Sequence, residues 1–364
     1  MAKTDLFIAN KELNENEIKA GKTILQSKPT MLMVVLTTRC NVGCIMCSRS
    51  KLPGPDKTFA FDIIKQVRNL FPYLEAIDWQ GGEVFLVDYF KDLFLEASAH
   101  PNIDQSIITN GLLINKEWAE IFANSKVNLT FSIDAVTKHK YENIRKGAKF
   151  ERLIESLEII NEMNKKCGDS IQLHINAVVM RSNYKELYLF PDFCQRYGIK
   201  HLRFDFLRPD VTPEEDILIN RDMEAIKCLR LELASIEKGC KDRGIWFEYT
   251  FRPFLTDAQT ENRDTKEESS TVRQEQNSLQ SKLKCKLPWK KIFIDAAAGG
   301  IVRPDCLCCE NAGNIMETPI GDIWNNSVMQ AYRKNIIKGT IENWCSETCL
   351  NNAVDTYQLE GYHT

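Results

Sequence analysis

Three cysteines, Cys40, Cys44 and Cys47, are spaced as C-x3-C-x2-C directly after an apolar run at 31–36. The run predicts a buried strand, and the cysteines then lie in the loop that leaves its end. Three thiolates in one short loop can bind the same iron–sulfur cluster, and because such clusters normally take four protein ligands, one iron stays open. The alternatives are a zinc knuckle or chance clustering. A zinc site usually needs a fourth ligand nearby, and no His or fourth Cys lies close in the sequence.

A second group of cysteines lies near the end of the chain. Cys285 precedes two short apolar runs that flank a pair of glycines, a pattern that predicts a β-hairpin. Cys306 follows this hairpin, and Cys345 and Cys349 close the group. These four thiolates are enough for one closed iron–sulfur cluster. A structural zinc site with the same four ligands is the alternative.

The second ligand of this group is ambiguous, because Cys308 and Cys309 follow Cys306 so closely. The position of Cys306, directly after the hairpin and Pro304, favours Cys306. Cys308 and Cys309 are therefore expected to be dispensable for the second site.

Bulk composition restricts the class of protein. A chain of 364 residues with 43% apolar content can bury a substantial core. The 47 basic and 50 acidic residues leave a formal charge of −3, which argues against a nucleic-acid binder led by electrostatics. The N-terminus has no signal-peptide pattern, and no run of about 18 apolar residues occurs that would span a membrane. The thirteen cysteines therefore predict a reduced, cytoplasmic, metal-binding protein.

From residue 31 the sequence alternates strand patterns with amphipathic helix patterns. The strand candidates are 31–36, 74–79, 103–109, 127–133, 171–179 and 200–207. Helical spacing fills the gaps near 58–71, 88–99, 115–124, 151–166 and 184–196. Six such units predict an α/β fold whose parallel sheet is covered by helices. A flat doubly wound sheet is the alternative to a partial barrel.

Four parts of the chain are predicted. A leader with helical spacing around 12–25 comes first, and a long helix over 213–240 follows the sixth strand. The segment 257–283 is almost entirely polar and charged, which predicts a mobile linker or lid. The predicted parts are the leader 1–30, the α/β unit 31–245, the linker or lid 246–284, and a small cysteine-rich α+β domain 285–364.

The first cysteine loop resembles the cluster loop of the radical S-adenosylmethionine (SAM) superfamily, in which the open iron chelates the amino and carboxylate groups of SAM. Gly81-Gly82-Glu83, after the second strand, resembles the superfamily's Gly-Gly-Glu motif, which binds the SAM amino group. Val84 replaces the usual proline. The resemblance implies a partial six-unit (β/α) barrel, a 4Fe-4S cluster and SAM as cofactors.

Further polar residues follow the predicted strands, where the ligand site of a parallel α/β fold lies. Thr109 and Asn110, and Ser132 and Asp134, resemble family segments that line the SAM ribose and carboxylate. Arg145 stands where family members carry an arginine near that carboxylate. A helix cap or a surface charge is the alternative for each.

Two strands carry further candidates for this site. His174 and Asn176 share one face of the fifth strand and could contact SAM or substrate, although a satisfied core histidine is the alternative. Asp205 and Arg208 close the sixth strand and are candidates for the substrate cavity, with a mutual ion pair as the alternative.

The second cysteine group resembles the auxiliary-cluster extension called SPASM in its long form and twitch in its short form. The chain lacks the denser cysteine run of the long form, so the resemblance implies one auxiliary 4Fe-4S cluster. Four leftover cysteines are expected to be buried apolar residues, or else a hydrogen donor to a substrate radical. These are Cys167, Cys194, Cys228 and Cys240.

The resemblance implies reductive cleavage of SAM to a 5′-deoxyadenosyl radical, which abstracts a hydrogen atom from the substrate. Modification of a peptide or protein is the first expectation, by oxidation, cross-linking or epimerisation. A dehydrogenase or epimerase of a sugar or other small intermediate is the second. A non-catalytic iron–sulfur scaffold or redox carrier is the alternative from another class. A low-potential electron donor such as flavodoxin or ferredoxin is an implied partner.

Overall fold

In the computed structural model, residues 4–51, 54–207, 211–218, 220, 222–250, 285–306, 308–340 and 344–345 are described, and ten strands of this part form one sheet. Seven neighbouring strands are parallel, so the predicted α/β class is confirmed, and the six predicted strands are all present. In sheet order these seven parallel strands are β1 (Met31–Val35), β3 (Ala76–Gln80), β4 (Asp104–Thr109), β5 (Val127–Ser132), β7 (Ile171–Val179), β8 (His201–Phe206) and β9 (Trp246–Tyr249).

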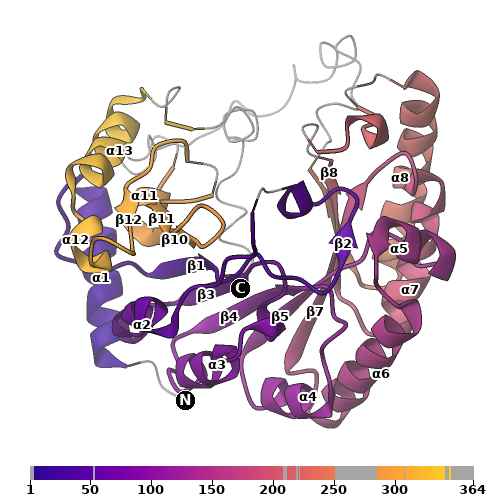
Figure 1. Cartoon of the computed structure of the whole chain (residues 1–364), viewed down its shortest axis with the longest axis horizontal. Coiled ribbons are helices and arrows are strands. Elements are labelled where there is room, and N and C mark those ends of the chain that lie inside the picture. Colours follow the sequence, from indigo (N-terminus) through magenta and orange to yellow (C-terminus); the bar gives the residue numbers. More distant parts are fainter. Residues whose placement is uncertain are drawn as a thin grey trace, which may run out of the picture.

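Helices cover the outer side of this sheet, which bends into an open arc (Figure 1). This arrangement is the partial barrel predicted from the sequence rather than a flat sheet. A 3₁₀ segment, Lys65–Tyr73, continues the first of these helices. The helices between the parallel strands are α2 (Phe61–Ile64), α3 (Phe90–Ser98), α4 (Lys116–Ala123), α5 (Lys138–Ile144), α6 (Phe150–Lys166), α7 (Phe190–Arg196) and α8 (Met223–Asp242).

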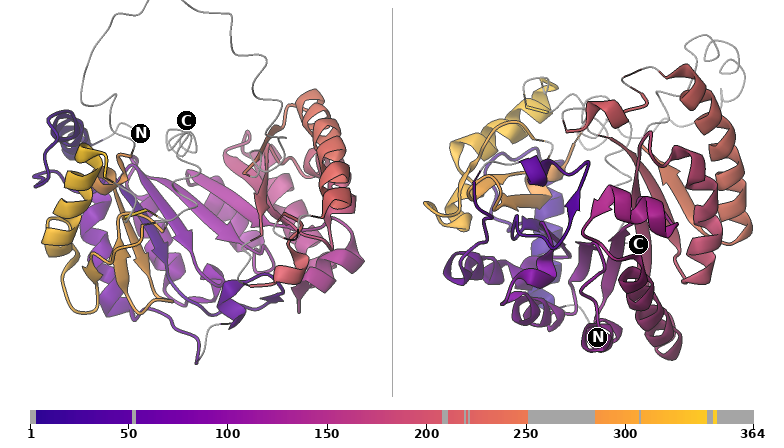
Figure 2. Two further views of the ribbon diagram at one scale, coloured as in Figure 1. Left: turned by 90° about the horizontal axis from the view of Figure 1, so that it is seen from above. Right: turned by 45° about the vertical axis from the view of Figure 1, so that its right-hand side comes forward.

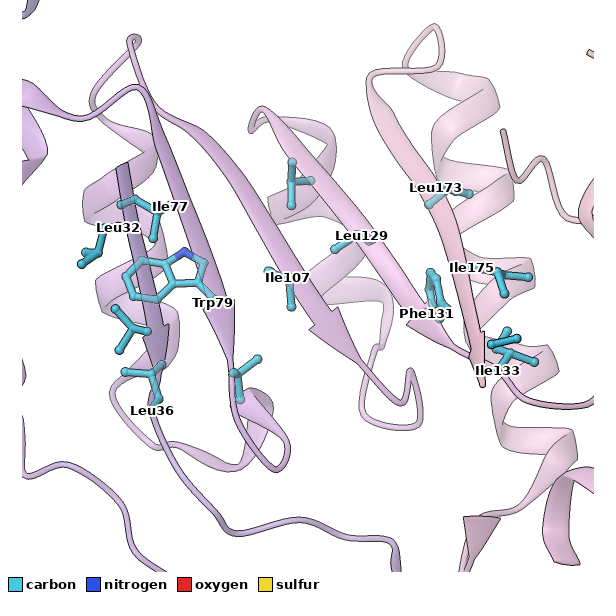
Figure 3. Packing of buried hydrophobic residues seen from close by; sticks show 14 of the residues in the cluster. Leu32, Leu36, Ile77, Trp79, Ile107, Leu129, Phe131, Ile133, Leu173 and Ile175 are labelled. Carbon is cyan, nitrogen blue, oxygen red and sulfur yellow. The ribbon is translucent and has the colours of Figure 1, made fainter. Parts of the chain in front are cut away.

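The main core lies between the sheet and these helices. Alternate residues of each strand point to the helices, and the strand register brings them together in rows such as Leu32–Ile77 and Phe131–Ile175 (Figure 3). Trp79 is fully buried there and meets Phe90 of α3 edge to face, with ring centroids 5.8 Å apart. The other face of the same strands is therefore free to carry polar side chains.

The C-terminal extension continues the same sheet. β10 (Lys291–Asp295) pairs parallel with β1, and β11 (Ile301–Arg303) and β12 (Gly313–Asn314) follow antiparallel. The predicted hairpin is confirmed in β10 and β11. The helices of the extension are α11 (Leu287–Lys290), α12 (Ile320–Ile323) and α13 (Ser327–Lys338).

The N-terminal helix α1 (Asp5–Lys19) packs beside this extension (Figures 1 and 2). Buried Asn14 donates to the Trp289 carbonyl (2.6 Å), and the Trp289 indole donates to the Lys22 carbonyl (2.7 Å). Buried Arg333 of α13 donates to the Thr23 carbonyl (2.8 Å). The two ends of the described chain therefore stabilise each other.

Some element boundaries differ from the prediction. α1 begins earlier than the predicted 12–25, because the Thr4 hydroxyl caps it by accepting from the Phe7 amide. α8 begins at Met223, where the Asp222 side chain caps the helix. β9 extends the sheet beyond the predicted boundary at 245.

The division into four parts stays a prediction, and the segment 257–283 lies outside the described residues. Every helix in the described ranges is too short or too polar to cross a lipid bilayer.

Candidate cluster and cofactor site

The first cysteine loop leaves the carboxyl end of β1 and pairs with the segment that follows helix α5. Its short strand β2 (Gly43–Cys44) pairs antiparallel with β6 (Arg145–Lys146), so that Cys44 lies opposite Arg145. Arg49, which the sequence reading missed, donates to the carbonyls of Thr38 (3.0 Å) and Val42 (2.9 Å). The loop thus has a fixed path before any ligand binds.

The three thiols of this loop are close enough to influence one another. The pKa of Cys44 is raised to about 11, mainly by burial, with smaller contributions from Asp134 and from the thiolates of Cys47 and Cys40. Burial also raises the pKa of Cys40. The Arg145 guanidinium, 3.5 Å from Cys44 Sγ, acts in the opposite direction. Three clustered thiols suit a metal cluster, because a bound metal supplies the positive charge that displaces their protons.

Two glycines allow the next loop to approach the cysteine loop. The Gly82 amide donates to the Thr37 carbonyl (2.7 Å), and the Glu83 amide donates to the Arg39 carbonyl (2.8 Å). A Cβ at Gly82 would lie 2.2 Å from the Arg39 carbonyl oxygen, so only glycine fits there. A Cβ at Gly81 would lie 2.7 Å from the Thr37 oxygen. The Gly-Gly sequence therefore serves loop packing at this position.

The Glu83 side chain is 1% exposed and points into the protein. The Thr109 hydroxyl donates to both carboxylate oxygens (2.9 and 3.0 Å), and the Asn110 amide donates to one of them (2.9 Å). Burial raises the pKa of Glu83 to about 7. The Asn110 side chain in turn donates to Asn41 Oδ1 (2.7 Å) in the cysteine loop. Glu83 and Asn110 therefore connect the ends of β3 and β4 to the cluster loop.

Asp134 and Arg145 form a buried ion pair. Arg145 Nη2 lies 2.6 Å from Asp134 Oδ2, and the side chains are only 7% and 1% exposed. The other Asp134 oxygen accepts from the Val178 amide (2.8 Å). Burial raises the pKa of Asp134, an effect that Arg145 opposes. Neither residue is thus a surface charge or a helix cap, and the pair joins β5 and β7 to Cys44.

The concave face of the sheet carries many polar side chains. Side chains alternate between the two faces along each strand, so the residues between the core residues point to this face. Ser132 and Asn176 are paired there, and the buried oxygen Asn176 Oδ1 has no hydrogen-bond partner among the described residues. A free acceptor beside a hydroxyl suits the hydroxyls of a bound sugar. Polar residues of this face include Asp78, Gln80, Ser106, Asn128, Thr130, Ser132, His174, Asn176, His201, Arg203, Asp205, Glu248, Lys291 and Asp295.

A charged cluster occupies the β8–β9 end of that face. Arg203 Nε donates to Asp205 Oδ1 (2.9 Å), and Arg203 Nη1 lies 3.5 Å from Glu248 Oε1. His201 Nε2 lies 3.3 Å from the same Glu248 oxygen. Burial and the neighbouring His201 lower the pKa of His174 to about 4, so this ring is neutral at pH 7.

The sequence reading named only part of this charged cluster. Asp205 is paired with Arg203 in the structure, whereas its predicted neighbour Arg208 lies outside the described residues. Arg203 and Glu248 were missed, although the alternation of charged and apolar residues in 201–206 signals a polar face.

The four leftover cysteines lie on or at the end of outer helices rather than at strand ends. Cys194 of α7 and Cys240 of α8 are buried and close enough that each thiolate would repel the other, and burial raises both pKa values. Cys228 of α8 lies 3.7 Å from Glu232. Cys167 is exposed at the end of α6. None of these four is therefore grouped with the cysteine loop.

In the second cysteine group, Cys285 precedes β10, and Cys306, Cys308, Cys309 and Cys345 follow β10, whereas Cys349 is outside the described residues. Lys291, which is buried on the concave face, lies 2.9 Å from Asp305 and 3.9 Å from Asp78. Cys306 follows Asp305 directly, and its thiolate would raise the pKa of Lys291 together with the two carboxylates. Cys308 and Cys345 face each other across an isolated antiparallel bridge.

Comparison with known families identifies part of the chain. Residues 34–187 match the model of the radical SAM superfamily. An uncharacterized protein of Methanocaldococcus jannaschii is 28% identical over 194 residues, which cover 49% of this chain and 63% of that protein. A cysteine-type anaerobic sulfatase-maturating enzyme of Clostridium novyi is 23% identical, with 48% of this chain and 50% of that enzyme covered. A GTP 3′,8-cyclase of Limosilactobacillus fermentum is 24% identical, with 58% and 61% covered. The match thus spans about half to three fifths of the length of these curated relatives.

Solved structures show the same fold over most of the chain. Streptococcus suis SuiB superposes with a TM-score of 0.61 at 19% identity, covering 89% of this chain and 71% of SuiB. Native anSMEcpe, solved with AdoMet and the Cp18Cys peptide, superposes with a TM-score of 0.59 at 16% identity. That match covers 92% of this chain and 95% of anSMEcpe. At such identities the likeness establishes the fold.

Proposed function

Because residues 34–187 are a radical SAM domain, which binds a 4Fe-4S cluster and SAM, we propose that the chain is a radical SAM enzyme that modifies a peptide or protein. The observation that carries this proposal is the three-cysteine loop held against Gly81-Gly82 at the carboxyl ends of the strands. The reaction class is oxidation, cross-linking or epimerisation at a carbon of the peptide.

The cluster ligands in this proposal are Cys40, Cys44 and Cys47. When bound, the cluster supplies the electron that cleaves SAM to methionine and a 5′-deoxyadenosyl radical. The protein orients the cofactor and excludes water, because the chemistry belongs to the cofactor. Arg145 compensates negative charge beside Cys44, and Asp134 fixes the direction of its guanidinium.

SAM would lie over the carboxyl ends of β3, β4, β5 and β7 in this proposal. The buried Glu83 carboxylate already accepts from Thr109 and Asn110, so in this proposal it positions the Gly-Gly backbone, whose carbonyl groups would meet the ammonium group of SAM. Ser132 and the unpaired Asn176 oxygen are the candidates for the ribose hydroxyls.

A peptide substrate is supported by the polar concave face and by two structural neighbours. SuiB has been solved with its precursor peptide SuiA, and anSMEcpe with peptide Cp18Cys. The cysteine-rich extension supports one auxiliary 4Fe-4S cluster, for which the sequence proposes Cys285, Cys306, Cys345 and Cys349. Removal of an electron from the substrate is a role for that cluster, and a low-potential protein such as flavodoxin or ferredoxin in a reducing cytoplasm would supply the first electron.

A small-molecule dehydrogenase or epimerase is the second candidate, because GTP 3′,8-cyclases are among the relatives. The charged cluster of Arg203, Asp205 and Glu248 would suit a polar small molecule as well as a peptide. A non-catalytic iron–sulfur carrier is the third candidate, and such a carrier would not need the SAM-binding residues proposed here.

The test uses the anaerobically reconstituted, reduced protein with SAM and small peptides encoded beside its gene, prepared with deuterated amino acids. Peptide-dependent transfer of deuterium into 5′-deoxyadenosine is the expected result, since the radical takes a hydrogen atom from the substrate. The Cys40→Ala/Cys44→Ala/Cys47→Ala variant is the control and should transfer none. Deuterium transfer from a sugar or nucleotide and from no peptide would favour the second candidate.

A further inference from the structure

The auxiliary site of the extension has more cysteines than one cluster needs, and the sequence alone selects Cys306 over Cys308 and Cys309. From the geometry of this segment we propose that Cys308, opposite Cys345, supplies a thiolate ligand of the auxiliary site. The inference rests on the proposed function in that it assumes an auxiliary metal cluster.

Backbone pairing brings Cys308 and Cys345 together. The two residues are directly opposite in an antiparallel bridge, an arrangement that puts their side chains on the same side with Cβ atoms roughly 5 Å apart. Both side chains are half-buried, and Cys345 packs against the core. Two thiols that share one direction and one sheltered position are suited to the same cluster.

The bridge is held in place by Tyr332 of α13. The Tyr332 hydroxyl accepts from the Glu310 amide (2.7 Å) and donates to the Glu310 carbonyl (2.7 Å). Its ring meets Trp344 edge to face, with centroids 4.7 Å apart. The segments on both sides of the bridge therefore pack on the same residue, which fixes the position of Cys308 before a metal binds.

The two neighbouring cysteines are less suited to the site. The Cys308 amide donates to the Asp305 carbonyl (3.1 Å), so Cys306 lies in a tight turn, where its side chain is exposed. The Cys306 thiol is also engaged elsewhere, because its Sγ lies 3.4 Å from Asp305 Oδ1. Cys309 is exposed. It directly follows Cys308 in an extended segment, so its side chain points to the opposite side and away from Cys345.

The experiment measures iron in a parent that lacks the first cluster, the Cys40→Ala/Cys44→Ala/Cys47→Ala variant. After anaerobic reconstitution this parent should hold about four iron atoms per chain. Adding Cys308→Ala should remove nearly all of this iron, as should Cys345→Ala, whereas the matched neighbour variant Cys309→Ala should keep it. Cys308→Ala in the otherwise unchanged protein should still hold about four iron atoms and bind SAM, which shows that the fold survives.

Failure of the inference and failure of the proposed function give different results. If the parent holds iron and Cys308→Ala retains it, Cys308 is not a ligand. If the parent holds no iron and non-reducing peptide mapping finds a Cys308–Cys345 disulfide, the auxiliary cluster itself is refuted.

Discussion

Replacement of Gly82 by alanine tests whether the Gly-Gly loop positions the cluster loop. The new Cβ would lie 2.2 Å from the Arg39 carbonyl oxygen and 2.6 Å from the Thr38 oxygen, whereas ordinary contacts begin near 3.4 Å. The Arg39 carbonyl must therefore retreat by roughly 1 Å, a strain of the kind that costs about 1–3 kcal/mol when a packed site is overfilled. Because Cys40 is the next residue, this shift displaces a cluster ligand.

The assay is iron content after anaerobic reconstitution, together with the thermal unfolding temperature. Gly82→Ala should lower the iron from about eight to about four atoms per chain, since only the auxiliary cluster would assemble. Gly43→Ala is the matched control, because it lies in the same cysteine loop and its Cβ would be 4.0 Å from the nearest atom. A Gly82→Ala protein with full iron content and wild-type unfolding temperature would refute this reasoning.

Three further predictions concern buried groups. The raised pKa of Glu83, about 7 instead of 4.5, means that the folded apoprotein loses stability as the pH rises from 4.5 to about 7, because the buried carboxyl must ionise. The loss should approach about 3 kcal/mol in pH-dependent melting curves of the wild-type protein and be absent in Glu83→Gln. The same dependence of stability on pH in both proteins would contradict this prediction. Arg145→Ala should destabilise by about 3–5 kcal/mol in chemical denaturation, since it leaves Asp134 as an uncompensated buried charge, and Asp134→Asn in the same protein should recover part of the loss. Cys194→Ala and Cys240→Ala should leave the product mass in deuterated water unchanged, because both thiols are buried on outer helices; loss of a solvent deuteron from the product would instead identify a hydrogen donor.

The sequence was sufficient for the parallel sheet, because local patterns specify it. Apolar runs bounded by turn residues predict buried strands, and each of the six is found within one or two residues of its predicted start. The cysteine loop and Gly81-Gly82-Glu83 were also correctly placed at adjacent strand ends, since a parallel sheet brings its carboxyl ends to one edge.

Long-range contacts could not be predicted in this way. The packing of α1 on the extension depends on side chains such as Asn14 and Arg333, which bond to carbonyl groups 275 and 310 residues away in the chain. The Asp134–Arg145 pair depends on the antiparallel pairing of two very short strands, for which two residues carry no periodic signal. Strand β9 was assigned to a linker because its four residues lie beside a long polar segment.

Reductive cleavage of SAM tests the central claim most directly. The reconstituted protein, reduced with dithionite or flavodoxin, should convert SAM to 5′-deoxyadenosine and methionine, as measured by liquid chromatography with mass spectrometry. The Cys40→Ala/Cys44→Ala/Cys47→Ala variant should form no 5′-deoxyadenosine while it keeps about half of the iron. Cleavage of SAM by that variant, or its absence in a fully iron-loaded wild-type protein, would contradict the assignment of a radical SAM enzyme with its active cluster on these three cysteines.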